Sequence, residues 1–330
     1  MSATTDFSAL KIAVGHATDE AGATGLTVVR GTDYPLRAGV ARFGRATGSR
    51  ELPTASPDHL VGGRVDAILL TGGSAYGLDA TAGVMDWMED NGRGFPVGPG
   101  VVPIVPAAVV FDLVPLGRFD ARPTRAMAFS ACESASSQVS EGCIGVGTGL
   151  TVGKVLGAAH CMKSGFGCSV VSSGDGEVTV GALAAVNAFG DVRDARNSII
   201  AGARGEDGSF VDTMRVMRGD APPPSSFDEL AMQNTTLIVV ASSAPLSAVE
   251  LRQLAHAAGA GLYRRITPVG TSFDGDLIFA VSPAQGERSR AEPIIIESLA
   301  VSAVEQAIER AVRLARGRDG IPGLADHHGD

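Results

Sequence analysis

The stretch Met232-Gln233-Asn234-Thr235-Thr236-Leu237-Ile238-Val239-Val240 sets a polar Asn-Thr-Thr step directly before an apolar run rich in β-branched residues. Such a run predicts a buried strand with polar residues at its N-terminal end. The Asn234–Thr235 bond is also a candidate for self-cleavage, which would leave Thr235 as a new N-terminal residue. An N-terminal threonine carries a hydroxyl nucleophile and an α-amine, of pKa roughly 8, that can take the hydroxyl's proton. Cleavage would therefore switch such an enzyme on.

Two plainer interpretations fit the same residues. Asn-Thr-Thr matches the glycosylation pattern Asn-x-Ser/Thr, which occurs often by chance and requires a secretory route. Residues 1–20 lack the basic-then-apolar pattern of a signal peptide. The stretch could also be only the start of a strand, so the local sequence alone leaves the choice open.

The composition predicts a soluble, cytoplasmic α/β protein. Of the 330 residues, 45% are hydrophobic and 19% charged, which favours a large buried core over disorder. A net charge of −9 argues against a nucleic-acid partner. The most apolar segment, 97–115, is interrupted by four prolines and is therefore not expected to cross a membrane. The four cysteines show no CxxC spacing, so we expect reduced thiols rather than a metal site.

Apolar β-rich runs alternate with helical patterns along the chain. Before Thr235 we expect strands at 26–30, 67–70 and 177–187, a helix from 78 to 91, and a Pro/Ser-rich linker at 219–226. After Thr235 we expect a strand (236–242), a helix (247–260), a strand (277–281), a helix (293–316) and a polar, frayed tail (317–330). The last third has too few elements to cover a sheet alone, so residues 1–330 are expected to form a single domain.

The glycine-rich run 145–154 does not match a phosphate-binding loop. That motif requires a glycine where Thr148 stands, and a Ser or Thr hydroxyl where Val155 stands. Lys154 could still project from this loop into a cleft, or it could simply be exposed to solvent.

Asp274-Gly275-Asp276 places two carboxylates at positions i and i+2, on one face of a strand end if both residues are extended. Such a pair can orient a hydroxyl nucleophile or hold an ammonium group. Asp-Gly is also a strong hairpin signal, and locally we expect a turn.

Gly72-Gly73-Ser74 lies between a strand and a helix start, where backbone N–H groups can bind an oxyanion or a substrate carboxylate. The alternative is a capped turn without a ligand. None of the six histidines has a convincing partner, so a metal site is not expected. A hydrolase without a histidine base needs another base, and an N-terminal amine is one.

Together these segments resemble the DmpA-type aminopeptidase family, which includes the nylon-oligomer hydrolases and belongs with the N-terminal-nucleophile hydrolases. The resemblance covers nearly the whole chain. It rests on segments 14–19, 24–28, 72–78 and 105–113, on Gly153-Lys154 and Asn187, on Asn234-Thr235-Thr236, and on Asp274-Gly275-Asp276.

The resemblance implies a four-layer αββα sandwich and self-cleavage into an α chain (1–234) and a β chain (235–330) that stay associated. It also implies a catalytic role for each matching residue: Thr235 as nucleophile, Asn187 as oxyanion donor, Lys154 and Tyr76 lining the site, and Asp274 and Asp276 supporting the nucleophile. The threonine and the Asp-Gly-Asp pattern look like the nylon-oligomer hydrolase branch.

We therefore expect a cofactor-free, homo-oligomeric hydrolase of short peptides, β-peptides or small amides. The nearest rival is an acyltransferase of the ornithine acetyltransferase type, in which an amine rather than water takes the acyl group. A third reading is an uncleaved small-ligand-binding protein.

Overall fold

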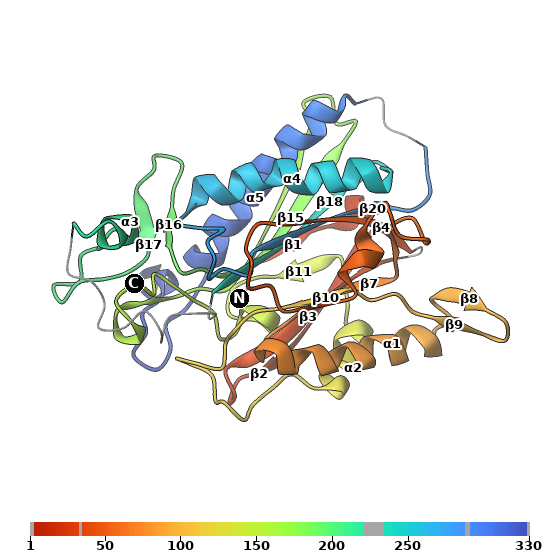
Figure 1. Ribbon diagram of the computed structural model, residues 1–330. Helices are drawn as coiled ribbons and strands as arrows, with labels where there is room; N and C mark the ends of the chain where they lie inside the picture. The colour runs from red at the N-terminus through yellow and green to blue at the C-terminus, as the bar shows by residue number, and fades with distance from the viewer. Residues whose placement is uncertain (1–2, 33–34, 221–233, 288–290, 329–330) are drawn as a thin grey trace.

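Two β-sheets packed face to face form the centre of the protein, and helices cover both outer faces (Figure 1). The computed structural model describes residues 3–32, 35–220, 234–287 and 291–328. The expected linker at 219–226 lies outside these ranges from residue 221 onward.

The first sheet has five strands, in the order β2-β3-β7-β10-β5. Its strands are β2 (Ile12–Asp19), β3 (Thr24–Gly31), β7 (Ala67–Thr71), β10 (Ala107–Val109) and β5 (Ser49–Arg50). Only β7 and β10 pair in parallel among these neighbours.

The second sheet has six strands, in the order β14-β15-β18-β20-β4-β6. Its strands are β14 (Phe166–Ser172), β15 (Thr179–Asn187), β18 (Thr235–Ser242), β20 (Leu277–Pro283), β4 (Leu36–Arg42) and β6 (Arg64–Val65). The central pair, β18 and β20, is parallel, and its neighbours on both sides are antiparallel. Residues after Asn234 therefore form the middle of a sheet whose outer strands come from residues before it.

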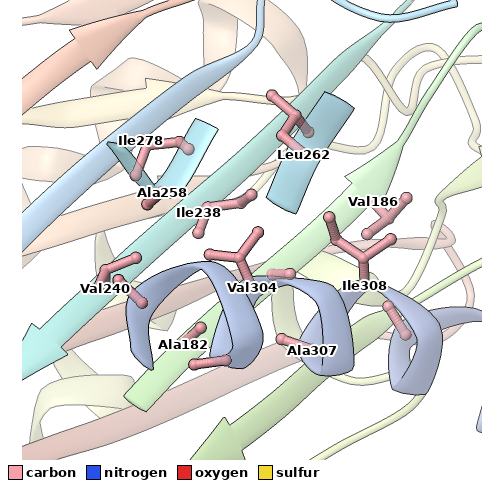
Figure 2. Close-up of a cluster of buried hydrophobic side chains, with 14 of the residues drawn as sticks. Ala182, Val186, Ile238, Val240, Ala258, Leu262, Ile278, Val304, Ala307 and Ile308 are labelled. Atoms are coloured by element: carbon pink, nitrogen blue, oxygen red, sulfur yellow. The ribbon is translucent and has the colours of Figure 1, made fainter. Parts of the chain in front are cut away.

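The helices complete a four-layer αββα arrangement, as the sequence resemblance implied. Helices α1 (Thr81–Asp90) and α2 (Arg125–Glu133) pack on the first sheet, and α4 (Ala248–Arg265) and α5 (Pro293–Arg313) pack on the second. Figure 2 shows Val304 and Ile308 of α5 directed toward Ile238 of β18 and Val186 of β15. A further apolar cluster fills the space between the two sheets.

Smaller elements complete the structure. They are the pairs β1 (Thr4–Asp6) with β11 (Gln138–Ser140), β8 (Phe95–Val97) with β9 (Gly100–Val102), β12 (Thr151–Val152) with β13 (Met162–Lys163), the sheet β17 (Ile199–Ala201), β16 (Asp191–Arg193) and β19 (Ile266–Thr267), and the short helix α3 (Thr213–Met217). In the part of the chain that the structure describes, every helix is too short or too polar to span a bilayer.

The elements expected after Thr235 agree with the structure to within a few residues. Helix α4 begins where predicted because Ser247 and Glu250 form a reciprocal capping box, with N···O distances of 3.3 and 2.8 Å. The helix expected from residue 78 begins as a 3-10 turn, Ser74–Ala80, and becomes α-helical at Thr81.

The frayed tail was a wrong expectation for the residues described. The Asp326 carboxylate accepts the N–H groups of Gly317 and Gly323, both at 2.8 Å, and closes the tail into a loop. The Lys163 N–H donates to the Pro322 carbonyl at 2.8 Å and ties this loop to the body. A single carboxylate thus organises a segment whose composition suggested disorder.

Candidate active site

Three strand ends of the second sheet meet at one point. Thr235, the first residue of β18, pairs with Asn187, the last residue of β15. On the other side, Asn234 forms a parallel bridge with Asp274, just before β20 begins. The sheet therefore brings together the predicted nucleophile, the predicted oxyanion donor and the carboxylate pair.

The Thr235 hydroxyl lies against the peptide bond that precedes it. Thr235 is 5% exposed, and its Oγ1 donates a hydrogen bond to the Asn234 carbonyl oxygen at 2.6 Å. The Gly275 N–H donates to the same oxygen at 2.9 Å. A Cβ atom at position 275 would lie 2.6 Å from Thr235 Oγ1, so this close approach requires glycine.

The two aspartates are buried and held by backbone N–H groups. Asp276 accepts hydrogen bonds from Thr236 N–H at 2.6 Å and Gly270 N–H at 2.9 Å. Burial, and after it the charge of Asp274, raises the pKa of Asp276 to about 7 against the lowering effect of these bonds. Burial likewise raises the pKa of Asp274, whose Oδ2 accepts from Thr271 N–H at 2.8 Å.

The hairpin expected at Asp274-Gly275 was wrong. The segment leads into a strand that pairs in parallel with β18, and a tight hairpin would connect antiparallel strands. Its carbonyl groups accept from residues 43–46: Asp274 O from Ala46 N–H at 3.0 Å, and Asp276 O from Phe43 N–H at 2.9 Å and Gly44 N–H at 3.2 Å. Asp274 and Asp276 are thus parts of a fixed buried segment.

Lys154 is buried beside Asn187 rather than exposed. Its Nζ donates to Asn187 Oδ1 at 2.8 Å and to the Asn187 carbonyl at 3.2 Å. Burial lowers the pKa of Lys154 to about 7, although the charges of Asp274 and Asp276 raise it. Burial thus brings the pKa values of Lys154 and Asp276 to about 7 and raises that of Asp274.

The Asn187 amide is fixed by three neighbours. Besides Lys154, the Thr151 N–H donates to its Oδ1 at 3.1 Å, and its own Nδ2 donates to the Phe111 carbonyl at 2.9 Å. These contacts fix which way the amide points, with Nδ2 toward the segment that follows β10.

Asp112, next to Phe111, holds the turn Gly72-Gly73-Ser74, although its place in the sequence indicated no such role. It accepts from Gly73 N–H at 2.6 Å and from Thr24 Oγ1 at 2.7 Å. Burial raises its pKa to about 6. A Cβ at Gly72 would lie 2.1 Å from Asp112 Oδ2, and Gly73 and Ser74 both have left-handed φ values, of 77° and 51°. The turn 72–74 is thus tied through residues 111–112 to Asn187.

The Tyr76 ring contacts Arg122 at the surface of the protein. Its side chain is 53% exposed, and the Arg122 guanidinium stacks 3.5 Å from the ring centroid. Among the described residues no hydrogen bond joins Tyr76 to Thr235 or Asn187. Tyr76 stands only a few residues from Gly73, so its role at the site stays a prediction.

The glycines before Lys154 allow close packing: a Cβ at Gly153 would lie 2.0 Å from the Ala203 nitrogen. No group of three or more His, Cys, Asp and Glu side chains is placed to hold a metal ion in the part of the chain described. The lining of a cavity of about 990 Å³, which includes Glu141, Cys143 and Lys163, contains none of Thr235, Asn187, Lys154, Asp274 and Asp276.

Comparison with known proteins agrees with this fold. The family model of Peptidase family S58 matches residues 3–324, so the chain belongs to that family. It is 39% identical over 271 residues to an uncharacterized aminopeptidase of Mycobacterium bovis, covering 79% of this chain and 73% of the relative. It is 28% identical over 285 residues to the 6-aminohexanoate-oligomer endohydrolase of a Kocuria species, covering 82% of this chain and 72% of the relative.

A solved structure with a similar fold is the L-aminopeptidase D-Ala-esterase/amidase from Ochrobactrum anthropi, a prototype of the serine aminopeptidases and a variant of the Ntn hydrolase fold. It superposes with a TM-score of 0.71 at 22% identity, covering 99% of this chain and 93% of that one. The chain thus has the Ntn-hydrolase fold variant of its family, and its relatives are aminopeptidases and amide-oligomer hydrolases.

Proposed function

We propose that this peptidase is a self-processing hydrolase that cuts its own Asn234–Thr235 bond and then uses Thr235 as an N-terminal nucleophile. The observation that carries the proposal is the position of the Thr235 hydroxyl, 2.6 Å from the Asn234 carbonyl oxygen at a buried strand start. Nearby lie two carboxyl groups with raised pKa values and a lysine with a lowered one. Perturbed groups that converge on a nucleophile are characteristic of catalytic sites.

In the mature enzyme the freed α-amine of Thr235 takes the hydroxyl proton as Oγ1 attacks a substrate amide carbon. The Asn187 amide nitrogen has two N–H groups, and we assign one to the oxyanion of this step. Lys154 positions that amide through its 2.8 Å bond to Oδ1. Asp274 and Asp276 attract and orient the Thr235 ammonium. The carbon–nitrogen bond of the substrate then breaks, the Thr235 ammonium gives its proton to the leaving amine, and water hydrolyses the Oγ1 ester to release the acid and restore the hydroxyl.

The substrates we propose are short peptides, β-peptides and small amides. The names of the relatives, an aminopeptidase and a 6-aminohexanoate-oligomer endohydrolase, both refer to hydrolysis of amide bonds. No described group of this site favours peptides over other amides. Water as the acyl acceptor distinguishes this enzyme from the acyltransferase alternative.

Processing is tested by intact mass and N-terminal sequencing of the purified protein. We expect fragments of residues 1–234 and 235–330, the second beginning Thr-Thr-Leu-Ile. Thr235→Ala should stay uncut and inactive, and Thr235→Ser, which keeps the hydroxyl, should still be cut. A full-length parent that hydrolyses amides without cleavage would refute the proposal.

Hydrolysis is tested with three probes: an L-aminoacyl p-nitroanilide, a β-aminoacyl p-nitroanilide and a 6-aminohexanoate oligomer. We expect the processed parent, and not Thr235→Ala, to release product from at least one of them. Adding a free amine separates the alternatives, because a transferase yields the acylated amine and a hydrolase yields the free acid.

A further inference from the structure

The carbonyl oxygen of the Asn234–Thr235 bond accepts two hydrogen bonds, from Thr235 Oγ1 at 2.6 Å and from Gly275 N–H at 2.9 Å. The second donor belongs to the Asp274–Gly275 peptide group. The carbonyl of that same peptide group accepts from Ala46 N–H at 3.0 Å. The group is therefore held at both ends and polarised toward the Asn234 oxygen.

These two donors behave differently when the bond is cut. In the first step Thr235 Oγ1 bonds to the Asn234 carbonyl carbon, the carbon–nitrogen bond breaks, and the hydroxyl proton ends on the Thr235 nitrogen. Water then hydrolyses the ester, giving the Asn234 carboxylate and restoring the hydroxyl. Once Oγ1 is bonded to carbon it cannot donate to the oxygen, so of these two donors only Gly275 N–H stays on the oxygen as negative charge develops there.

We propose that the backbone N–H of Gly275 is the oxyanion donor of the self-cleavage step, separate from the Asn187 amide assigned to substrate hydrolysis. This rests on the proposed function, because it takes Thr235 as the nucleophile. The observation behind this assignment is that Gly275 N–H already contacts the reacting oxygen, at 2.9 Å. A fixed donor in a buried site acts without reorganisation.

The position also explains why glycine stands between the two aspartates. A Cβ there would lie 2.6 Å from Thr235 Oγ1 and 3.2 Å from the Ala46 carbonyl oxygen. Any side chain at position 275 would thus displace either the Thr235 hydroxyl or the Ala46 backbone, whose N–H holds the Asp274 carbonyl. Glycine lets the peptide group approach the scissile bond from the side of β20.

A competing explanation is that this contact is only the last pairing bond between β18 and β20, through the Asn234–Asp274 bridge. An ordinary pairing bond contributes to stability and leaves the rate of cleavage unchanged. The two explanations therefore differ in whether losing the N–H slows the reaction.

The test replaces the Gly275 N–H by an ester oxygen, by incorporating glycolic acid at position 275 during cell-free translation. This removes the donor without adding an atom. The matched control is the same replacement at Gly174, which is exposed and has no neighbour within 4 Å of its Cβ position. Pulse-labelled chains are followed to the cut products on a denaturing gel, and thermal midpoints confirm folding.

We expect the ester at 275 to slow cleavage about 10²–10³-fold relative to the parent and to the ester at 174, as for the loss of one oxyanion donor. If the chain with the ester at 275 is cut at Asn234–Thr235 as fast as the control chain, the assignment is overturned and the proposed function stays intact. A parent chain that is never cut would overturn both.

Discussion

Backbone N–H groups of segment 43–46 donate hydrogen bonds to the carbonyl groups of Asp274 and Asp276. A single methyl group added at Gly44 should show how much the site depends on this segment. A Cβ at Gly44 would lie 1.9 Å from the Asp274 carbonyl oxygen and 2.9 Å from the Asp276 nitrogen. Restoring ordinary contact at 3.4 Å requires a shift of 3.4 − 1.9 = 1.5 Å. Because the obstacle is backbone on both sides, the Asp274–Asp276 segment has to move.

We therefore expect Gly44→Ala to be stable enough to fold and slow to process. Overpacking of this kind costs about 1–3 kcal/mol, which corresponds to a fall of several degrees in thermal midpoint at roughly 2–4 °C per kcal/mol. A displacement above about 1 Å at a reacting centre can cost around 10²-fold in rate. The rate should thus fall much further than the stability alone suggests.

The assay is a pulse-chase of cell-free translated protein on a denaturing gel, with the thermal midpoint measured in parallel on uncut Thr235→Ala backgrounds. Gly100→Ala is the matched control, because its Cβ position has no atom within 4 Å. Gly44→Ala that is cut at the parental rate and melts with the parent would show that segment 43–46 does not position the carboxylates.

Three further outcomes follow from the same contacts. Asn187→Ala should be processed but turn over substrate about 10²–10³-fold more slowly with little change in KM; near-normal kcat would remove Asn187 from the mechanism. Of Asp274→Asn and Asp276→Asn, assayed separately, at least one should lose most activity while keeping its fold, and two fully active variants would leave the pair a structural feature only. The pKa of Lys154 is lowered from 10.5 to about 7, so the unfolded state binds more protons between these values and stability rises with pH across that window. Lys154→Met should reduce this rise in the free energy of unfolding between pH 7 and 10, measured by denaturant titration, and an unchanged slope would contradict the burial of a neutral amine.

The sequence predicted secondary structure best where the residues of one segment alone determine whether it forms a strand or a helix. The apolar runs after Thr235 predicted β18, α4, β20 and α5 closely, because burial of apolar side chains follows a local pattern. Strand β4 was not predicted, because Leu36–Arg42 is rich in small residues rather than β-branched ones. A Cβ at its Gly39 would lie 2.2 Å from the Arg252 nitrogen of α4, so close helix packing selected that composition.

The candidate site followed the same rule. Thr235 could be named because it stands at the start of an apolar strand, whereas the role of Asn187 came from the resemblance to the family. The role of Asp112 could not, since its partners Gly73 and Thr24 lie 39 and 88 residues away along the chain. The Asp-Gly hairpin was mispredicted because turn propensity is a weaker constraint than the parallel pairing of β18 with β20.

The central place of β18 and β20 in the six-stranded sheet has a consequence for how the protein withstands denaturation. A cut at Asn234 would leave the inner strands on one polypeptide and the outer strands on another, joined along the β15–β18 and β20–β4 seams. Refolding would then be a second-order encounter between two chains, and the midpoint of unfolding would rise with protein concentration. The uncut chain refolds by a first-order process. Maturation would thus make the stability of the protein depend on the concentration of its two chains.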